Sequence, residues 1–295
     1  MNKQLKENPW KKLTEGEVKI AERDDAFFKE WAKKNHVEGN IDEIVKAYAE
    51  KINAKTWIDK ETGETKNVGL TFDCLPDPFC GNPDSKVYCL NLNPGKPDDR
   101  FKEVEKFKEA CEKNLRLESA TCYWAEGTGN DGKEHAGTGW LHDRTKEIEQ
   151  ILNENCSGEK CLPDIFFIEY FPYHSTSGFG FPKKRLMRKV KNAEGKTEWQ
   201  HREKKSEENS YPASYDFSDQ LIEQAMKDKK MIIIMRAQGD WLKRIEGLAD
   251  YEHLYILSSP QCGYLTLRNI MNYKTGKRLE DEENYKEIIK KYFKI

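Results

Sequence analysis

The chain has 295 residues, of which 50 are lysine or arginine and 52 are aspartate or glutamate, so its formal net charge is −2. A chain of this length can bury a core of its own, and one large domain with insertions is expected. The near balance of charge excludes a global basic field, so a nucleic-acid partner would have to meet a local basic patch. No apolar run is long enough to cross a membrane, and the N-terminus lacks an apolar signal core. These features predict a cytoplasmic protein without a membrane partner.

The N-terminal part carries two helical patterns, at residues 24–35 and 40–53, in which apolar residues recur at intervals of three and four. Asn40 or Asp42 would suit the start of the second helix. We predict that residues 1–70 form a helical extension packed on the core, and that residues 71–295 form the main domain. The eight cysteines include no C-x-x-C pair, so reduced thiols are expected, with neither a metal nor a cofactor.

Four later segments are short apolar runs that each end in polar or turn-forming residues. These segments are residues 86–95, 164–174, 229–239 and 253–261. Helical patterns lie between and after them, at residues 99–115, 142–155, 216–230, 240–250 and 282–293. Continuous apolar runs are typical of parallel strands covered on both faces. The alternation predicts an α/β fold, a three-layer sandwich with a central, mostly parallel four-stranded sheet flanked by helices.

In such sheets, ligands bind beyond the carboxyl ends of the strands. All four strand ends carry candidate side chains: Asn93, Glu169 to His174, Arg236 with Gln238, and Ser258 to Gln261. We therefore expect one site at this edge of the sheet.

Residues 183–210 interrupt the pattern with many lysines and arginines around an "NAEGK" turn. The segment is either a β-hairpin or a mobile loop. It is either a solvated surface insertion or a basic arm that contacts phosphates, in which case Lys183, Lys184 and Arg185 are candidate DNA contacts.

Two motifs suggest a family. "LNLNPG" at residues 90–95 resembles the first motif of the uracil-DNA glycosylase superfamily, especially that of its mismatch-specific branch. "ILSSPQ" at residues 256–261 resembles the second motif, at the end of the last strand. The resemblance covers roughly residues 70–270 and implies a DNA partner, single- or double-stranded, and cleavage of an N-glycosidic bond.

The resemblance also implies roles for individual residues. Asn93 would position the attacking water, and Pro94 and Gly95 would let the backbone approach a flipped nucleotide. The alternative is a strand-ending turn in which Asn93 caps the backbone. Leu257 stands where the fast uracil enzymes carry histidine. His174 either donates to the departing base in its place or is a structural histidine.

By the same resemblance, residues after the last strand would contact the DNA backbone and the duplex rather than the flipped base. Ser258 and Ser259 would contact phosphates, and Gln261, or nearby Tyr264 or Leu265, would fill the space that a flipped base leaves. The alternative is a tight polar loop.

Base recognition needs a stacking face and a reading group. Phe79, Tyr170 and Tyr173 either stack on the base or are ordinary core aromatics. Glu169 stands where the uracil-specific branch carries a reading asparagine. An ionised glutamate offers only acceptors and would suit the amino group of cytosine, unless it is a salt-bridged or solvent-facing carboxylate.

These observations predict a DNA glycosylase that excises a modified or damaged pyrimidine and leaves an abasic site. The superfamily includes a bacterial anti-phage enzyme that removes glucosylated hydroxymethylcytosine, and such a substrate would suit Glu169 and the absent histidine. The alternatives are a uracil or mismatch repair glycosylase and a catalytically inactive DNA-binding member of the fold.

Overall fold

The computed structural model describes residues 7–58, 62–101, 104–122, 132–154, 161–176, 187–191, 193–201, 211–261 and 263–294. Lys183, Lys184 and Arg185 lie outside the described residues. Within them, no helix is both long enough and apolar enough to cross a membrane.

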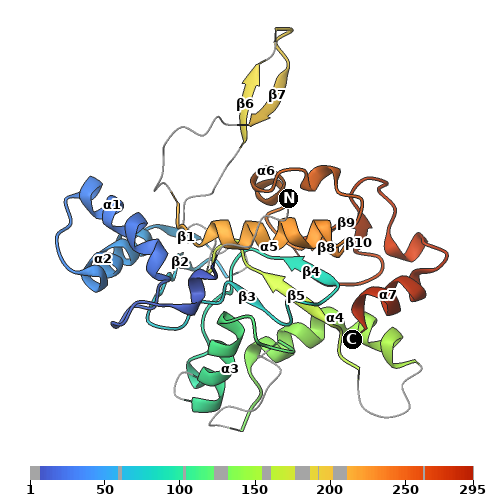
Figure 1. Ribbon diagram of the computed structural model, residues 1–295, viewed down its shortest axis with the longest axis horizontal. Helices are drawn as coiled ribbons and strands as arrows, with labels where there is room; N and C mark the ends of the chain where they lie inside the picture. Colours follow the sequence, from blue (N-terminus) through green and yellow to red (C-terminus); the bar gives the residue numbers. More distant parts are fainter. Residues whose placement is uncertain are drawn as a thin grey trace.

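A six-stranded sheet forms the centre of the fold, in the order β10-β9-β8-β4-β5-β3 (Figure 1). Its members are β3 (Phe79–Cys80), β4 (Val87–Leu90), β5 (Ile165–Ile168), β8 (Met231–Ile234), β9 (Leu254–Leu257) and β10 (Ile270–Asn272). The middle strands β9, β8, β4 and β5 run parallel, whereas β3 and β10 pair antiparallel at the two edges. The predicted α/β class and mostly parallel sheet are confirmed. The prediction of a four-stranded sheet is wrong, because the sheet has two further strands, β3 and β10, at its edges.

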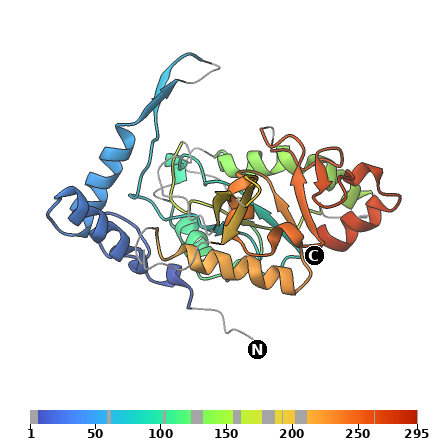
Figure 2. The same ribbon diagram turned by 90° about the horizontal axis from the view of Figure 1, so that it is seen from above.

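Helices cover both faces of the sheet, and Figure 2 shows α5 and α4 on opposite sides of the strands. The helices are α1 (Asp25–Asn35), α2 (Ile41–Asn53), α3 (Glu105–Leu115), α4 (Ala136–Asn153), α5 (Tyr215–Lys227), α6 (Gln238–Arg244) and α7 (Tyr285–Phe293). Short 3₁₀ turns occupy Pro9–Lys11, Glu22–Asp24, Asp99–Phe101, Leu248–Asp250 and Leu279–Asp281. One core cluster joins a sheet face to α1, α2, α5 and α6, and a second joins the other face to α3, α4 and α7.

Residues within each strand alternate between these two clusters. In β4, Tyr88 and Leu90 belong to the first cluster, whereas Val87 and Cys89 belong to the second. All four side chains are buried, which explains why the strand reads as a continuous apolar run.

The N-terminal segment shares the first cluster with the sheet. Trp10 and Phe28 belong to the same cluster as Phe72 and Tyr173, and Trp10 packs edge-on against Tyr173 at 5.8 Å between ring centroids. Of the two predicted starts of α2, Asn40 is the N-cap, in a capping box with Glu43.

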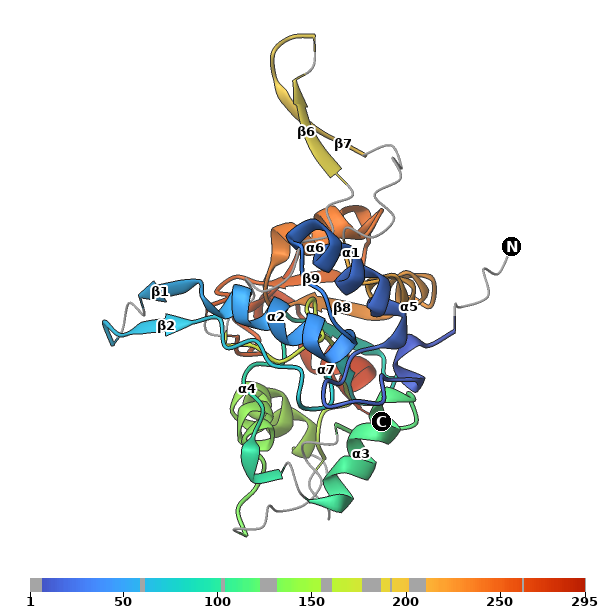
Figure 3. The same ribbon diagram turned by 90° about the vertical axis from the view of Figure 1, so that its left-hand side faces the viewer.

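Two hairpins extend from this body, as Figure 3 shows. Strand β1 (Thr56–Ile58) pairs with β2 (Thr65–Asn67), and β6 (Met187–Lys191) pairs with β7 (Thr197–His201). The second pair lies in the basic insertion, so the hairpin alternative is observed for its described residues, 187–191 and 193–201.

Candidate functional site

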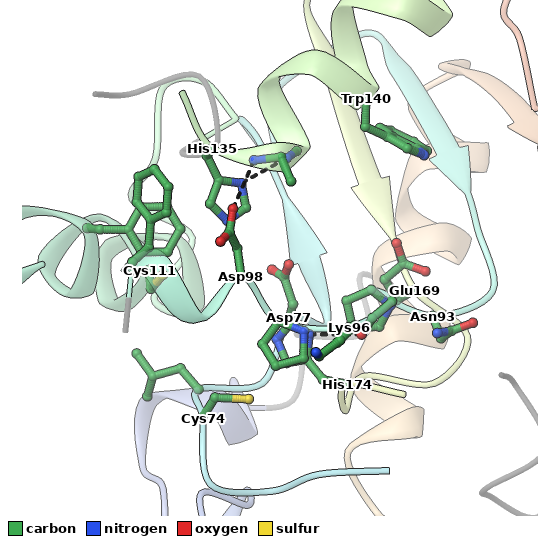
Figure 4. Close-up of a pocket in the computed structure, with 18 of the residues that line it drawn as sticks. Cys74, Asp77, Asn93, Lys96, Asp98, Cys111, His135, Trp140, Glu169 and His174 are labelled. Carbon is green, nitrogen blue, oxygen red and sulfur yellow. Dashed lines mark hydrogen bonds between the residues drawn. The ribbon is translucent and has the colours of Figure 1, made fainter. Parts of the chain in front are cut away.

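The candidate site lies where the order of the strands reverses. The chain leaves β4, enters β5 on one side of it, and then crosses back to β8 on its other side. A crevice therefore opens at the carboxyl end of β4, as expected for an open α/β sheet. A cavity of about 740 Å³ occupies this position and is lined by residues that follow β4, β5 and β8. Figure 4 shows Asn93, Glu169 and His174 around it.

Asn93 is held in the cavity wall by the loop that follows β5. Its Nδ2 donates to the carbonyl oxygen of Ser175 at 2.6 Å, and the amide of Ser175 donates to the carbonyl of Gly95 at 3.0 Å. Gly95 has φ of 77°, which favours glycine, and no atom lies within 4 Å of where a Cβ would stand. Asn93, Pro94 and Gly95 all line the cavity, and the bond to Ser175 leaves the Asn93 side-chain oxygen available as an acceptor.

Glu169 and Asn91 form a buried polar pair that also lines the cavity. Asn91 Nδ2 donates to Glu169 Oε1 at 2.9 Å. The other two side-chain oxygens, Asn91 Oδ1 and Glu169 Oε2, are buried and accept no hydrogen bond from the described residues. Buried polar atoms are ordinarily paired, so these two oxygens are suited to a polar ligand.

The protonation state of Glu169 differs from the expectation. Burial raises the pKa of Glu169 to about 8, assisted by the charge of Asp77 and opposed by the Asn91 hydrogen bond and by Arg236. The carboxyl is therefore mostly neutral at pH 7, and the expected ionised glutamate is corrected to a group with one donor and one acceptor. The alternative of a solvent-facing or salt-bridged carboxylate is also wrong, because the side chain is 4% exposed and forms no ion pair with the described residues.

His174 also lines the cavity. Its Nδ1 is 3.2 Å from the carbonyl oxygen of Gly95, and burial lowers the pKa of the imidazole. The ring is therefore neutral near pH 7 and acts as a hydrogen-bonding group rather than as a cation.

The outer part of the cavity is aromatic. His135 stacks on Phe107 at 4.8 Å between centroids and meets the edge of Phe101 at 4.7 Å. Its Nδ1 accepts from the amide of Gly137, so His135 caps α4, which begins earlier than the predicted residue 142. Asp98 lies beside this group, and Arg100 lowers the pKa of its carboxyl to about 2.

The three aromatic residues expected to stack on a base lie elsewhere. Phe79 packs against Phe166 and Phe217, and Tyr170 packs against Trp241 and the guanidinium of Arg244. Tyr173 donates to Asp24 at 2.6 Å. All three are at most 1% exposed and none lines the cavity, so the stacking expectation is corrected to a core role, because each ring faces the first core cluster.

The segment after β9 forms an exposed loop beside the site. Ser258, Ser259 and Gln261 are exposed, and Tyr264 is 43% exposed. Buried Asn269 fixes the loop: Oδ1 accepts from the Ser258 hydroxyl at 3.0 Å and from the Ser259 amide at 2.7 Å, and Nδ2 donates to the Tyr264 carbonyl at 2.8 Å. None of these four loop residues lines the cavity, so the structure separates them from Asn93 and Glu169.

Several cavity residues were not predicted, although their positions carry signals. Asn91 follows β4 directly, Asp77 lies in the Pro-rich loop before β3, and Trp140 lies in the first turns of α4. Asn91, a polar residue at a strand end, and Asp77, an acid in a long loop, could both have been recognised as candidate site residues from the sequence. Trp140 had no such signal, because the start of α4 was not predicted.

Comparison of the chain with protein-family models, with curated proteins and with solved structures gives no match.

Proposed function

We propose that the protein is a DNA glycosylase that flips a modified cytosine into the cavity and hydrolyses its N-glycosidic bond. The observation that carries this proposal is the buried Asn91–Glu169 pair, two of whose side-chain oxygens accept no hydrogen bond from the described residues. Both residues line the cavity that Asn93 also lines. The resemblance of "LNLNPG" and "ILSSPQ" to the two glycosylase motifs supports it, since both segments span the carboxyl ends of parallel strands, β4 and β9.

Asn93 positions the attacking water. Because its Nδ2 donates to the Ser175 carbonyl, its Oδ1 can accept a hydrogen bond from water and so direct a water lone pair towards the sugar carbon. An amide is too weak a base to remove that proton early, so it acts by orientation while the bond to the base breaks.

The polar pair reads the base. A neutral Glu169 donates through Oε2 to N3 of cytosine, and Asn91 Oδ1 accepts from the N4 amino group. Uracil would instead place its O4 acceptor against the Asn91 oxygen and leave two acceptors facing each other. The pair therefore favours a base that carries an amino group.

The same carboxyl assists departure of the base. A neutral glutamic acid with a pKa near 8 can transfer its proton to N3 as the glycosidic electrons move onto the ring. Cytosine then leaves as a neutral base. Water adds to the sugar carbon, and the proton that this water releases restores the acid through solvent.

The size of the cavity supports a substituted base. About 740 Å³ lies in the upper part of the ~300–1,000 Å³ range of ligand sites, and a single pyrimidine ring fills only part of it. The Phe107–His135 stack and the ionised Asp98 offer an apolar face and hydroxyl acceptors. A hydroxymethyl group, or a sugar attached to it, matches these groups.

The test is alkali-labile site formation on duplex and single-stranded oligonucleotides. The strands carry cytosine, hydroxymethylcytosine, glucosylated hydroxymethylcytosine, uracil or hypoxanthine. We expect abasic sites with the modified cytosines. Asn93→Ala should bind DNA but excise at least ~10²-fold more slowly, because an orienting group acts mainly in the transition state.

Asn284→Ala is the matched control, since Asn284 is exposed at the start of α7 and its side chain makes no capping bond. It should behave as the wild type. Excision of uracil or hypoxanthine alone would instead identify a repair glycosylase. Binding without excision of any base by the wild type would identify an inactive binder.

A further inference from the structure

Two arginines lie together beside the cavity. Arg236 follows β8 and lines the cavity, and Arg144 lies in α4 one turn after Trp140, which also lines it. A Cβ on Gly263, in the segment after β9, would lie 3.5 Å from Arg144 Nε and 3.7 Å from Arg236 Nη2. Both guanidinium groups therefore lie close to the backbone of Gly263.

Neither arginine is neutralised by the part of the chain that the structure describes. Arg144 Nη1 donates to the Trp140 carbonyl at 3.3 Å, whereas its Nε is buried and has no hydrogen-bond partner there. No described carboxylate forms an ion pair with Arg144 or Arg236. After burial, the nearby Arg236 charge is the largest influence that lowers the pKa of Arg144, and it exceeds the opposing effect of Asp143.

Aromatic rings hold Arg144 in place. Its guanidinium carbon lies 4.4 Å from the centroid of Trp140 and 5.5 Å from that of Tyr264. Stacking of this kind fixes the plane of a guanidinium while leaving edge N–H groups available. A half-buried pair of like charges that is held rigidly is electrostatically unfavourable until an anion binds between them.

We propose that Arg144 and Arg236 form a clamp for one phosphodiester of the DNA strand, next to the nucleotide whose base enters the cavity. This inference rests on the proposed function. Paired guanidinium groups match phosphate oxygens through bidentate hydrogen bonds. Gly263, with φ of 64°, adds no side-chain atoms at the point that both guanidinium groups reach.

The clamp lies close to the residues proposed to bind the base. Arg236 lies close enough to Glu169 for its charge to lower the pKa of that buried carboxyl, so a phosphate on Arg236 lies one side chain away from the base-reading pair. The exposed Ser258–Gln261 segment, which also follows β9, continues the same face for the adjacent backbone.

The test measures anion and DNA binding without requiring excision. Arg144→Gln, Arg236→Gln and the double variant are compared with wild type by melting temperature in sodium phosphate and in sodium chloride of equal ionic strength. Binding of a fluorescent unmodified oligonucleotide is then measured over a salt series. Each single variant should lose the phosphate-specific stabilisation and bind DNA roughly 10-fold more weakly.

The double variant should be little weaker than either single one, because both arginines serve one phosphate, and its log–log salt slope should fall by roughly 1. Lys227→Gln is the matched control. Lys227 is exposed, ends α5, and precedes β8, so it lies at the opposite edge of the sheet. It should leave both measurements unchanged.

The outcomes separate this inference from the proposed function. Unchanged DNA binding in the double variant would overturn the clamp. If, in that case, phosphate still raised the melting temperature of wild type but not of the variants, the arginine pair would be assigned to a free phosphorylated ligand. Weakened DNA binding together with no excision of any base would keep the clamp and reject the glycosylase. Equal losses in Lys227→Gln would show a general charge effect and would also overturn the clamp.

Discussion

At the residue scale, Glu169 links the chemistry of the site to the stability of the fold. Its pKa rises from 4.5 to about 8, chiefly because burial penalises the charged form. Below pH 4.5 the folded and unfolded chains both hold the proton. Between pH 4.5 and 8 the unfolded chain releases it and the folded chain does not, so the free energy of unfolding falls as pH rises. Glu169 therefore costs about 3 kcal/mol at pH 7.

Glu169→Gln should remove this cost, because glutamine is neutral at every pH. We expect the variant to be more stable than wild type at pH 8 by about 4 kcal/mol, and to lose nearly all of that advantage at pH 4.5. Urea unfolding at both pH values measures the difference. Excision should fall on the order of 10²-fold or more, since the amide cannot transfer a proton.

Glu283→Gln is the control for this comparison, because Glu283 is exposed before α7. Its difference from wild type should be small at both pH values. An advantage of Glu169→Gln that is equal at pH 4.5 and pH 8 would show that Glu169 is ionised in the folded protein. The neutral carboxyl, and the base reading derived from it, would then be wrong.

At the scale of elements, the loop between β9 and β10 depends on one buried amide. Asn269 is 8% exposed and bonds to Ser258, Ser259 and Tyr264. Asn269→Ala should lower the free energy of unfolding by about 1–3 kcal/mol, because the Ser259 amide and Tyr264 carbonyl lose a partner. It should also weaken DNA binding, since Tyr264 stacks beside the arginine pair.

Hydrogen exchange at residues 258–264 and urea unfolding measure these effects, with Asn284→Ala as the reference. Faster exchange confined to this loop is the expected pattern. Uniformly faster exchange over the sheet would mean that Asn269 supports the whole fold rather than the loop.

The strands differ in how far sequence predicts them. The four parallel strands were predictable because both faces are covered, so every residue is apolar. Strand β3 has two residues and β10 has three, which is too short for a periodic pattern, and tertiary pairing defines them.

The same contrast holds for the site. Asn93, Glu169 and His174 were predictable because parallel strands bring their carboxyl ends together. Tyr170 and Tyr173 follow the same strand as Glu169, yet they turn into the core. Strand-end position alone does not determine the side to which an aromatic ring turns, because core packing decides it.

At the scale of the whole molecule, the N-terminal segment is tied to the sheet by a buried carboxyl. Asp24 precedes α1, accepts from the Tyr173 hydroxyl at 2.6 Å, and accepts from the amide and hydroxyl of Ser214 at 2.8 and 2.7 Å. Burial raises its pKa to about 6 although these bonds oppose the rise. One side chain thus joins three regions: the extension, the loop after β5 and the start of α5.

This arrangement predicts that the extension and the sheet unfold together. Asp24→Ala leaves the Ser214 amide and the Tyr173 and Ser214 hydroxyls without their buried acceptor, so the free energy of unfolding should fall by about 2–4 kcal/mol. Because Trp10 and Trp241 report on the extension and on the sheet, single-tryptophan versions of the protein allow each region to be followed in urea. The two transitions should coincide and shift together in the variant, as two-state unfolding requires. Loss of the Trp10 signal at a lower urea concentration than the Trp241 signal would show that residues 7–53 are a separate unit docked on the sheet. Their unfolding would then remove Lys19 from the cavity wall while the sheet stays folded.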